Sequence, residues 1–442
     1  MARIYLGNTM IENDLLETSK GNANIALAEL FEAYVECRKN KRNTMNALNF
    51  ELDYERELIT LWEEIHAGTY QPGRSIAFIV DKPVKREIFA ADFRDRVVHH
   101  LVINKLNPLF ECLFIQDSYA CRKNKGAQAG ILRASRFIRQ CSHGYTRNCY
   151  ILKLDIQGFF MAINKRILWG KLRDFIAMHY PHQDHGLLLE LCYKILNNNP
   201  TKNCFIKGSR RNWDNLPPNK SLFHSKPDCG LPIGNLTSQI FANFYMNAFD
   251  HFMKHDLGIR YYGRYVDDFL VVHQDRAYLK SLIPRIADFL STTLGLTLHP
   301  RKVYLQHYTK GVTFLGMKLK PHRIVAGKRI KGNFYDAISK HNKVAQSHKP
   351  SREEQAAFLC SMNSYLGILK HYNTYHLKKR ILKKHLSIWW WNLVYLSSGC
   401  AKLTPKTRKL RKNKAHEAKT IAALICLIDE QEQSKVAHKF RG

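Results

Sequence analysis

Apolar residues recur at every third or fourth position in several stretches of the chain, a spacing that places them on one face of an α-helix. The pattern is clearest between residues 236 and 252, where Leu236, Ile240, Phe244, Ala248 and Phe252 share one face. Similar spacing predicts helices at residues 26–31, 54–62, 86–107, 127–139, 187–197, 278–294, 351–395 and 421–431. Helices therefore account for much of the chain.

Short runs rich in Ile, Val, Leu and Phe predict strands at residues 75–80, 150–160 and 313–320. Residues 263–272 carry apolar side chains on both sides of Asp267 and Asp268, which predicts a hairpin of two short strands with the acid pair at its turn. Two carboxylates held close together raise each other's pKa. A divalent cation such as Mg²⁺ would relieve the repulsion, whereas a simple surface turn would need none.

A third carboxylate, Asp155, interrupts the apolar strand at residues 150–160. A carboxylate among Ile, Leu and Phe costs several kcal/mol if it has no partner. Asp155 is therefore expected at the strand end, protonated, or bound to metal. Three aspartates on neighbouring strands can hold two metal ions about 4 Å apart, as in-line phosphoryl transfer requires.

The charge balance points to a partner. Among 442 residues there are 69 Lys and Arg against 37 Asp and Glu, a formal net charge of +32. Such an excess repels itself unless a polyanion neutralises it, so nucleic acid is the expected partner. An anionic membrane surface is the alternative, but no strongly amphipathic basic anchor is visible.

Composition also bounds the location. No stretch of about 18 apolar residues predicts a membrane span, and the first residues lack the layout of a secretion signal. The 11 cysteines are scattered without the spacing of a zinc site. These features predict a cytoplasmic protein with reduced thiols. A chain of this length suits two or three domains.

Basic residues supply candidate contacts. Arg86, Arg94 and Arg96 could meet phosphate, although a solvated helix face accounts for them as well. Arg122 and Lys125 lie on a short loop before a predicted helix, an arrangement that suits a triphosphate clamp. Basic residues mixed with aromatics later in the chain suit nucleic-acid contacts with stacking. These are Lys378, Lys379, Arg380, Arg408, Lys409, Arg411 and Lys412.

Three further stretches stand out. The tryptophans at 389–391 could stack on nucleic acid or simply pack in a core. The polar loop at residues 207–223 is too long for a simple turn, which suggests a functional insert. The glycines within residues 230–239 would let the backbone approach a ligand closely.

The order of these motifs resembles the palm of reverse transcriptases over roughly residues 75–390. The motifs are Asp155, Gly-Leu-Pro-Ile-Gly at 230–234, Tyr-Val-Asp-Asp at 265–268, Lys302 and Phe-Leu-Gly at 314–316. Asp-Ser-Tyr-Ala-Cys-Arg-Lys at 117–123, the segment 213–223, residues 230–239 and Ser-Tyr-Leu-Gly at 364–367 look like bacterial enzymes of two kinds. These are the enzymes of diversity-generating retroelements and related antiphage-defence reverse transcriptases.

The resemblance implies an α+β right-hand polymerase with fingers, palm and thumb and an antiparallel palm sheet. A helical N-terminal region and a helical basic C-terminal extension would flank it. The implied divisions are 1–74 for the N-terminal region, 75–149 for the fingers, 150–320 for the palm with a fingers insert at about 170–228, 321–395 for the thumb, and 396–442 for the extension.

The resemblance also assigns roles. It implies an RNA-directed DNA polymerase that uses two Mg²⁺ ions, with Mn²⁺ as a substitute. Asp155, Asp267 and Asp268 would be the catalytic metal ligands, joined by the carbonyl of Ile156. Phe160 would block a ribose 2′-hydroxyl, which implies a DNA product. The nucleotide-binding set is Arg122, Lys125, Phe160, Ile233, Gly234, Gln239 and Lys302.

The chain departs from retroviral enzymes at two positions that matter for copying accuracy. Ile233 stands where they carry Gln, and Gln239 stands where they carry Pro. The Gln touches the incoming nucleotide, so an aliphatic residue loses a hydrogen bond worth about 1 kcal/mol. We hypothesise reduced fidelity, as in the diversity-generating enzymes. The basic segment beyond Lys402 does not align, and we hypothesise that it grips a structured RNA.

The expected partners are a structured template or non-coding RNA, a primer and its cDNA product, and dNTPs. A small accessory protein or a second reverse transcriptase would join them, and no membrane is expected. One competing interpretation is a non-catalytic RNA-binding protein built on a reverse-transcriptase palm. Another is an RNA-templated RNA polymerase, which Phe160 opposes. The diversity-generating and defence roles both stay open.

Overall fold

The computed structural model describes residues 24–39, 44–81 and 84–406. The chain divides into two compact units, Met1–Leu315 and Gly316–Gly442. The predicted helix at 421–431 and the candidate contacts Arg408, Lys409, Arg411 and Lys412 lie outside the described residues. No described helix is long and apolar enough to cross a membrane.

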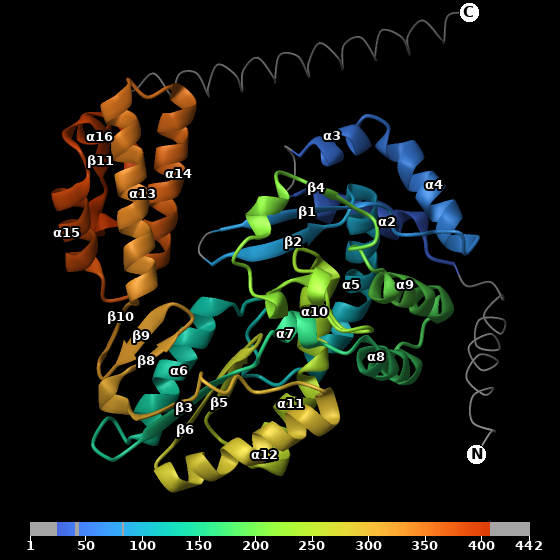
Figure 1. Ribbon diagram of the computed structural model, residues 1–442, viewed down its shortest axis with the longest axis horizontal. Helices are drawn as coiled ribbons and strands as arrows, with labels where there is room; N and C mark the ends of the chain where they lie inside the picture. Colours follow the sequence, from blue (N-terminus) through green and yellow to red (C-terminus); the bar gives the residue numbers. More distant parts are fainter. Residues whose placement is uncertain (1–23, 40–43, 82–83, 407–442) are drawn as a thin grey trace, which may run out of the picture. The chain divides into compact units, whose positions relative to one another are not determined.

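The first unit is organised around a four-stranded antiparallel sheet (Figure 1). Its strand order is β5 (Tyr262–Tyr265), β6 (Asp268–His273), β3 (Tyr150–Asp155) and β7 (Tyr304–His307). β5 and β6 form the hairpin predicted from the sequence. The mixed helical and antiparallel architecture confirms the predicted α+β fold class.

Both faces of this sheet are covered, so most residues of its central strands are apolar and buried, with Lys153 as an exception on β3. Adjacent residues point to opposite faces, yet Ile151, Leu152, Leu270 and Val271 are all at most 1% exposed. Helix α12 (Arg276–Leu294) packs against β3, β6 and β7, and α6 (Ala127–Cys141) packs against β5 and β6. The sheet is therefore a rigid platform for residues at its strand ends.

A second, three-stranded sheet lies in the same unit, in the order β2 (Arg86–Ala90), β1 (Ser75–Val80), β4 (Cys204–Ile206). The prediction of one helix over 86–107 is wrong, because β2 pairs with β1 and the helix α5 (Phe93–Leu113) begins only after Asp92. The Asp92 side chain accepts a hydrogen bond from the Arg94 amide and thereby caps the helix.

Helices enclose the remaining core of the first unit, with α5 at its centre. Residues on α5 pack with α2, α9 and α10 in one continuous cluster of buried side chains. The helices are α2 (Leu27–Arg38), α3 (Met45–Glu51), α4 (Tyr54–His66), α7 (Phe159–Ala162), α8 (Lys165–His179), α9 (His185–Asn197), α10 (Leu236–Tyr245) and α11 (Asn247–His251). The polar loop at 207–223, called the insert below, contains short 3₁₀ turns at Arg210–Trp213 and Pro218–Lys220.

The strand expected at 313–320 is interrupted. β8 (Val312–Phe314) ends before Leu315 and Gly316, which have φ of 50° and 84°, and β9 (Met317–Lys320) follows them. Positive φ at two consecutive residues turns the chain and ends the strand. β9 pairs with β10 (Arg323–Ala326) as an antiparallel hairpin that opens the second unit.

The second unit is mainly helical. It contains α13 (Lys328–Ser347), α14 (Arg352–Leu369), α15 (Tyr375–His385), α16 (Ile388–Leu393) and the strand pair β11 (Val394–Leu396) and β12 (Leu403–Pro405). Trp390 is fully buried and stacks on Phe358, with ring centroids 3.8 Å apart. Core packing is therefore the role of this tryptophan.

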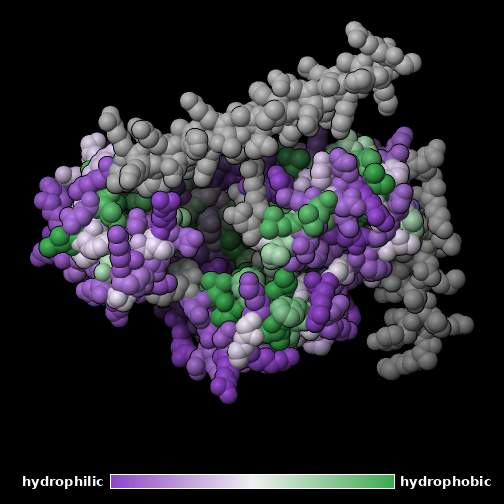
Figure 2. Space-filling view, turned by 90° about the horizontal axis from the view of Figure 1, so that it is seen from above, coloured by the Kyte–Doolittle hydropathy of each residue, from purple (hydrophilic) through white to green (hydrophobic). Residues whose placement is uncertain are grey.

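Figure 2 shows mainly hydrophilic side chains on the face of the molecule seen from above.

Candidate active site

The Asp-Asp hairpin ends in a tight turn next to the last residue of β3. Asp267 lies in the turn, Asp268 is the first residue of β6, and Asp155 lies opposite Asp268 in the strand register. Val266 precedes them with φ of 57°. A β-branched residue in this left-handed conformation costs about 1–3 kcal/mol, so the surrounding structure has to hold the turn in place.

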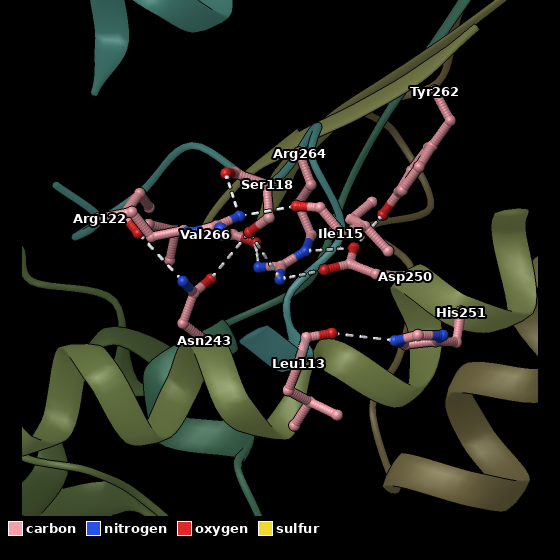
Figure 3. Close-up of polar contacts among 11 residues, drawn as sticks. Leu113, Ile115, Ser118, Arg122, Asn243, Asp250, His251, Tyr262, Arg264 and Val266 are labelled. Atoms are coloured by element: carbon pink, nitrogen blue, oxygen red, sulfur yellow. Dashed lines mark hydrogen bonds and ion pairs between the residues drawn. The ribbon is translucent and has the colours of Figure 1, made fainter. Parts of the chain in front are cut away.

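The side chain of Arg264 donates a hydrogen bond to this turn (Figure 3). Its guanidinium is fully buried and donates from Nη1 to the Val266 carbonyl at 3.0 Å. The other side of the guanidinium forms a bidentate pair with buried Asp250, at 2.7 Å to Oδ1 and 2.5 Å to Oδ2. Tyr262 also donates to Asp250, at 2.6 Å. A helix residue therefore fixes the hairpin turn through one arginine.

Two lysines offset part of the charge of the three acids. Lys302 Nζ lies 2.6 Å from Asp155 Oδ2, and Lys153 Nζ lies 3.0 Å from Asp268 Oδ1. Burial, followed by the charge of Asp155, raises the pKa of Asp267. Burial also raises the pKa of Asp268 to about 6, although Lys153 opposes the shift. The cluster is therefore short of positive charge even with both lysines in place.

The donor set fits a divalent cation. Asp268 Oδ1 is buried, and although the Lys153 ammonium lies 3.0 Å away it does not form a well-aligned hydrogen bond to this oxygen, so a lone pair is available to a metal. Among the described residues, no three His, Cys, Asp or Glu side chains converge as a complete metal cage. Mg²⁺ commonly takes only one or two protein carboxylates and completes its shell with water and substrate phosphates. The carboxylates here match that incomplete kind of site.

Backbone contacts place the other residues expected near the metal. Asp155 O accepts from the His299 amide at 2.8 Å, and Ile156 forms a backbone bridge with Leu298. These contacts bring the segment that carries Lys302 beside the end of β3. The role of the Ile156 carbonyl stays a prediction.

The glycine-containing turn after residue 230 is joined to β2. The Phe89 amide donates to the Ile233 carbonyl at 2.8 Å. Gly234 has φ of 128°, and a Cβ atom there would lie 2.8 Å from Ile88 Cγ2. Glycine is therefore required by contact within the fold as well as by conformation. Gln239 is exposed on α10 and accepts a hydrogen bond from Cys121 Sγ at 3.1 Å.

The structure places Arg122 and Lys125 differently from a free triphosphate clamp. The Arg122 side chain is only 6% exposed and pairs with Glu111 at 2.9 Å. It also donates to the Ile115 carbonyl at 2.6 Å (Figure 3). Lys125 Nζ donates to the Gln116 carbonyl at 3.0 Å. Both cations close their own loop, because its carbonyls need donors.

The basic residues expected to meet nucleic acid have varied surroundings. Arg86 is exposed, and its charge acts on Asp267. Arg94 is paired with Glu64, and Arg96 donates to the Ala91 carbonyl at 2.8 Å. Lys378, predicted to contact nucleic acid, is only 3% exposed, and its Nζ donates to the Gly399 carbonyl at 3.2 Å. Lys379 and Arg380 are exposed on α15.

Sequence reasoning missed Lys153 and Arg264. Lys153 was detectable, since a residue two positions before Asp155 on a strand shares its face. Arg264 was not, because its partner Asp250 comes from a helix and nothing in the local pattern marks the pair.

The contact between Lys153 and Asp268 leads to a testable prediction about how the Mg²⁺ requirement depends on pH. Only ionised Asp268 can ligate Mg²⁺, so protons compete with the metal as the pH falls through about 6. We expect the Mg²⁺ concentration for half-maximal activity to rise there. Lys153→Met should move this rise to higher pH, because Lys153 lowers the pKa of Asp268. Lys153→Arg is the matched control, and identical profiles for the Met variant and the parent would contradict the assignment.

This chain is similar in sequence to known proteins. A family model described as reverse transcriptase (RNA-dependent DNA polymerase) matches residues 82–319. Protein YkfC of Escherichia coli strain K12 is 22% identical over 297 residues, which cover 60% of this chain and 71% of YkfC.

Solved telomerase structures also match. One, from Candida albicans in complex with a TWJ fragment of telomeric RNA, has 13% identity and a TM-score of 0.41 and covers 71% of this chain and 56% of that chain. Apo telomerase from Candida tropicalis has 11% identity and a TM-score of 0.42, and the match covers 72% of this chain and 60% of that chain. This chain therefore spans less than two thirds of these solved chains.

Proposed function

This chain belongs to the reverse transcriptase family, and from that membership we propose that it copies a structured or non-coding RNA into cDNA by two-metal nucleotidyl transfer. The observation that supports this most directly is the strand register that sets Asp155 opposite Asp268, with Asp267 in the adjoining turn. In a family of RNA-directed DNA polymerases, these carboxylates would serve the reaction.

The side chains would divide the work as follows. Asp155, Asp267 and Asp268 would hold the metal ions. Bound Mg²⁺ supplies the charge that acidifies a primer 3′-hydroxyl and neutralises departing pyrophosphate. Lys302, which lies 2.6 Å from Asp155 in the structure, would contact the phosphates of a bound nucleotide. Phe160, half-buried on α7 just beyond Asp155, would exclude a ribose 2′-hydroxyl.

The direct test is primer extension by the full chain on an RNA template with Mg²⁺ and dNTPs. We expect template-dependent DNA synthesis that a chelator abolishes and that added Mg²⁺ or Mn²⁺ restores. Binding of RNA without any extension would overturn the proposal in favour of a non-catalytic RNA-binding protein. Sequencing of cDNA from cells would separate the two biological roles: adenine-directed substitutions indicate a diversity-generating role, and repetitive or untemplated DNA during phage infection indicates defence.

The aliphatic residue at 233 predicts low copying accuracy. Ile233 packs partly against a buried apolar cluster and offers no hydrogen bond to a nucleotide. Ile233→Gln is expected to reduce misincorporation opposite template adenine by about fivefold, the equivalent of one hydrogen bond. Ile233→Val is the matched control and should leave the error rate unchanged. Equal error rates in the Gln variant and the parent, measured by single-nucleotide steady-state kinetics, would count against this role.

A further inference from the structure

The insert is anchored by a buried acid that the polymerase reaction does not use. Glu87 on β2 is fully buried and accepts three hydrogen bonds from the insert. The donors are Trp213 Nε1 at 2.6 Å, Ser221 Oγ at 2.7 Å and the Leu222 amide at 2.5 Å. Donors from the middle and from the C-terminal end of the insert thus meet on one carboxylate, which ties the two parts of this polar loop together.

The anchored insert reaches the segment between Asp155 and Phe160. Gly158 has φ of 56°, and a Cβ atom there would lie 2.6 Å from the Asn219 carbonyl oxygen. The 3₁₀ turn Pro218–Lys220 also packs on α7, the helix that carries Phe160. The backbone of the insert therefore rests directly against the chain that leads from the metal-binding acid to the predicted sugar-excluding ring.

One small apolar cluster completes this connection. Phe160 and Ile233 are half-buried and both pack against the cluster, as does Trp213 of the insert. The buried members of the cluster are Ala77, Phe89, Met161 and Leu222, of which the last belongs to the insert. The two residues expected to select the sugar and the base thus share a packing surface to which the insert contributes.

We propose that the insert is a specificity element, with Glu87 as the positioning residue that fixes Phe160 and Ile233 against a bound nucleotide. This inference rests on the proposed function, because it concerns which nucleotide the same site accepts. Loosening the insert would let both side chains shift, and a shift of about 1 Å can change rates about a hundredfold. The effect would fall on discrimination between nucleotides more than on incorporation of the correct dNTP.

The test compares variants of the full chain by steady-state incorporation of a matched dNTP, the matching rNTP and a mismatched dNTP. Glu87→Gln removes an acceptor, and Trp213→Phe removes one donor while it keeps an aromatic ring. Leu222→Ala removes the side chain that the insert contributes to the apolar cluster. This variant still tests the inference if Glu87→Gln does not fold. Phe160→Ala is the positive control, and Asp214→Ala, at an exposed position of the insert, is the matched negative control.

We expect the preference for dNTP over rNTP, taken from kcat/KM, to fall about tenfold or more in the anchoring variants and to stay unchanged in Asp214→Ala. If the parent extends primers, two results would overturn the inference. One is an unchanged preference in all three variants; the other is a uniform loss of activity with unchanged ratios, which indicates a structural role only. Failure of the parent to extend any primer would instead refute the proposed function.

Discussion

Replacing Asp267 and Asp268 together by Asn is expected to lower primer extension by about 10⁴-fold or more, as removal of a catalytic group typically does. The double variant removes two oxygen anions that Mg²⁺ would need while it keeps the shape of the turn. Primer extension on an RNA template measures the loss. Asp174→Asn, at an exposed position, is the matched control.

The same variant should fold at least as well as the parent. The pKa of Asp268 is raised to about 6 in the folded chain from an ordinary 3.8. The folded state therefore binds a proton more readily than the unfolded state, and ionised Asp268 destabilises the fold at pH values above about 6. Thermal unfolding near neutral pH should show no loss, and RNA binding should persist. Retained extension by the double variant would rule out these acids as the metal ligands.

Arg264→Met is expected to destabilise the first unit by about 3–5 kcal/mol, because it leaves Asp250 charged, buried and without its cation. It should also abolish activity, since the Val266 carbonyl loses its donor and the hairpin turn is no longer held. Urea unfolding and primer extension measure the two effects separately.

The double variant Arg264→Met, Asp250→Leu separates positioning from stability. Removing both charges leaves no unpaired buried ion, so much of the stability should return. Activity should not return, because the Val266 carbonyl still lacks a donor. A double variant that regained full activity along with stability would show that Arg264 acts only through the fold. The result would therefore show whether Arg264 positions Asp267 and Asp268 in addition to stabilising the fold.

The sequence was sufficient for features that depend on neighbouring residues. The hairpin over 263–272 follows from runs of β-branched and apolar residues around isolated acids. The strand predicted over 150–160 is shorter in the structure, because β3 ends at Asp155 and helix α7 begins at Phe159. The pairing of Asp155 with Asp268 could not be read in advance, because strand register between distant segments depends on the packing of the whole sheet. Local pattern therefore predicted the parts of the site but not their alignment.

Buried polar groups explain the remaining differences. In the sequence, Glu87 and Arg122 look like ordinary charged residues. Their roles depend on the hydrogen-bond and ion-pair partners that the fold brings to them. The donors to Glu87 lie 126 to 135 residues away in the chain. Arg122 could hold a phosphate or close a loop with equal ease, and only the positions of Glu111 and the Ile115 carbonyl show that it closes the loop here.

The contact between Gly158 and the insert constrains how this protein can evolve. A side chain at position 158 would collide with the Asn219 carbonyl for as long as the insert is present. A descendant that lost the insert would be released from that steric requirement, whereas one that kept it would not. The glycine that follows β3 and the distant loop should therefore be inherited together, and a graft of the loop onto a relative should succeed only where the recipient already carries glycine at that position.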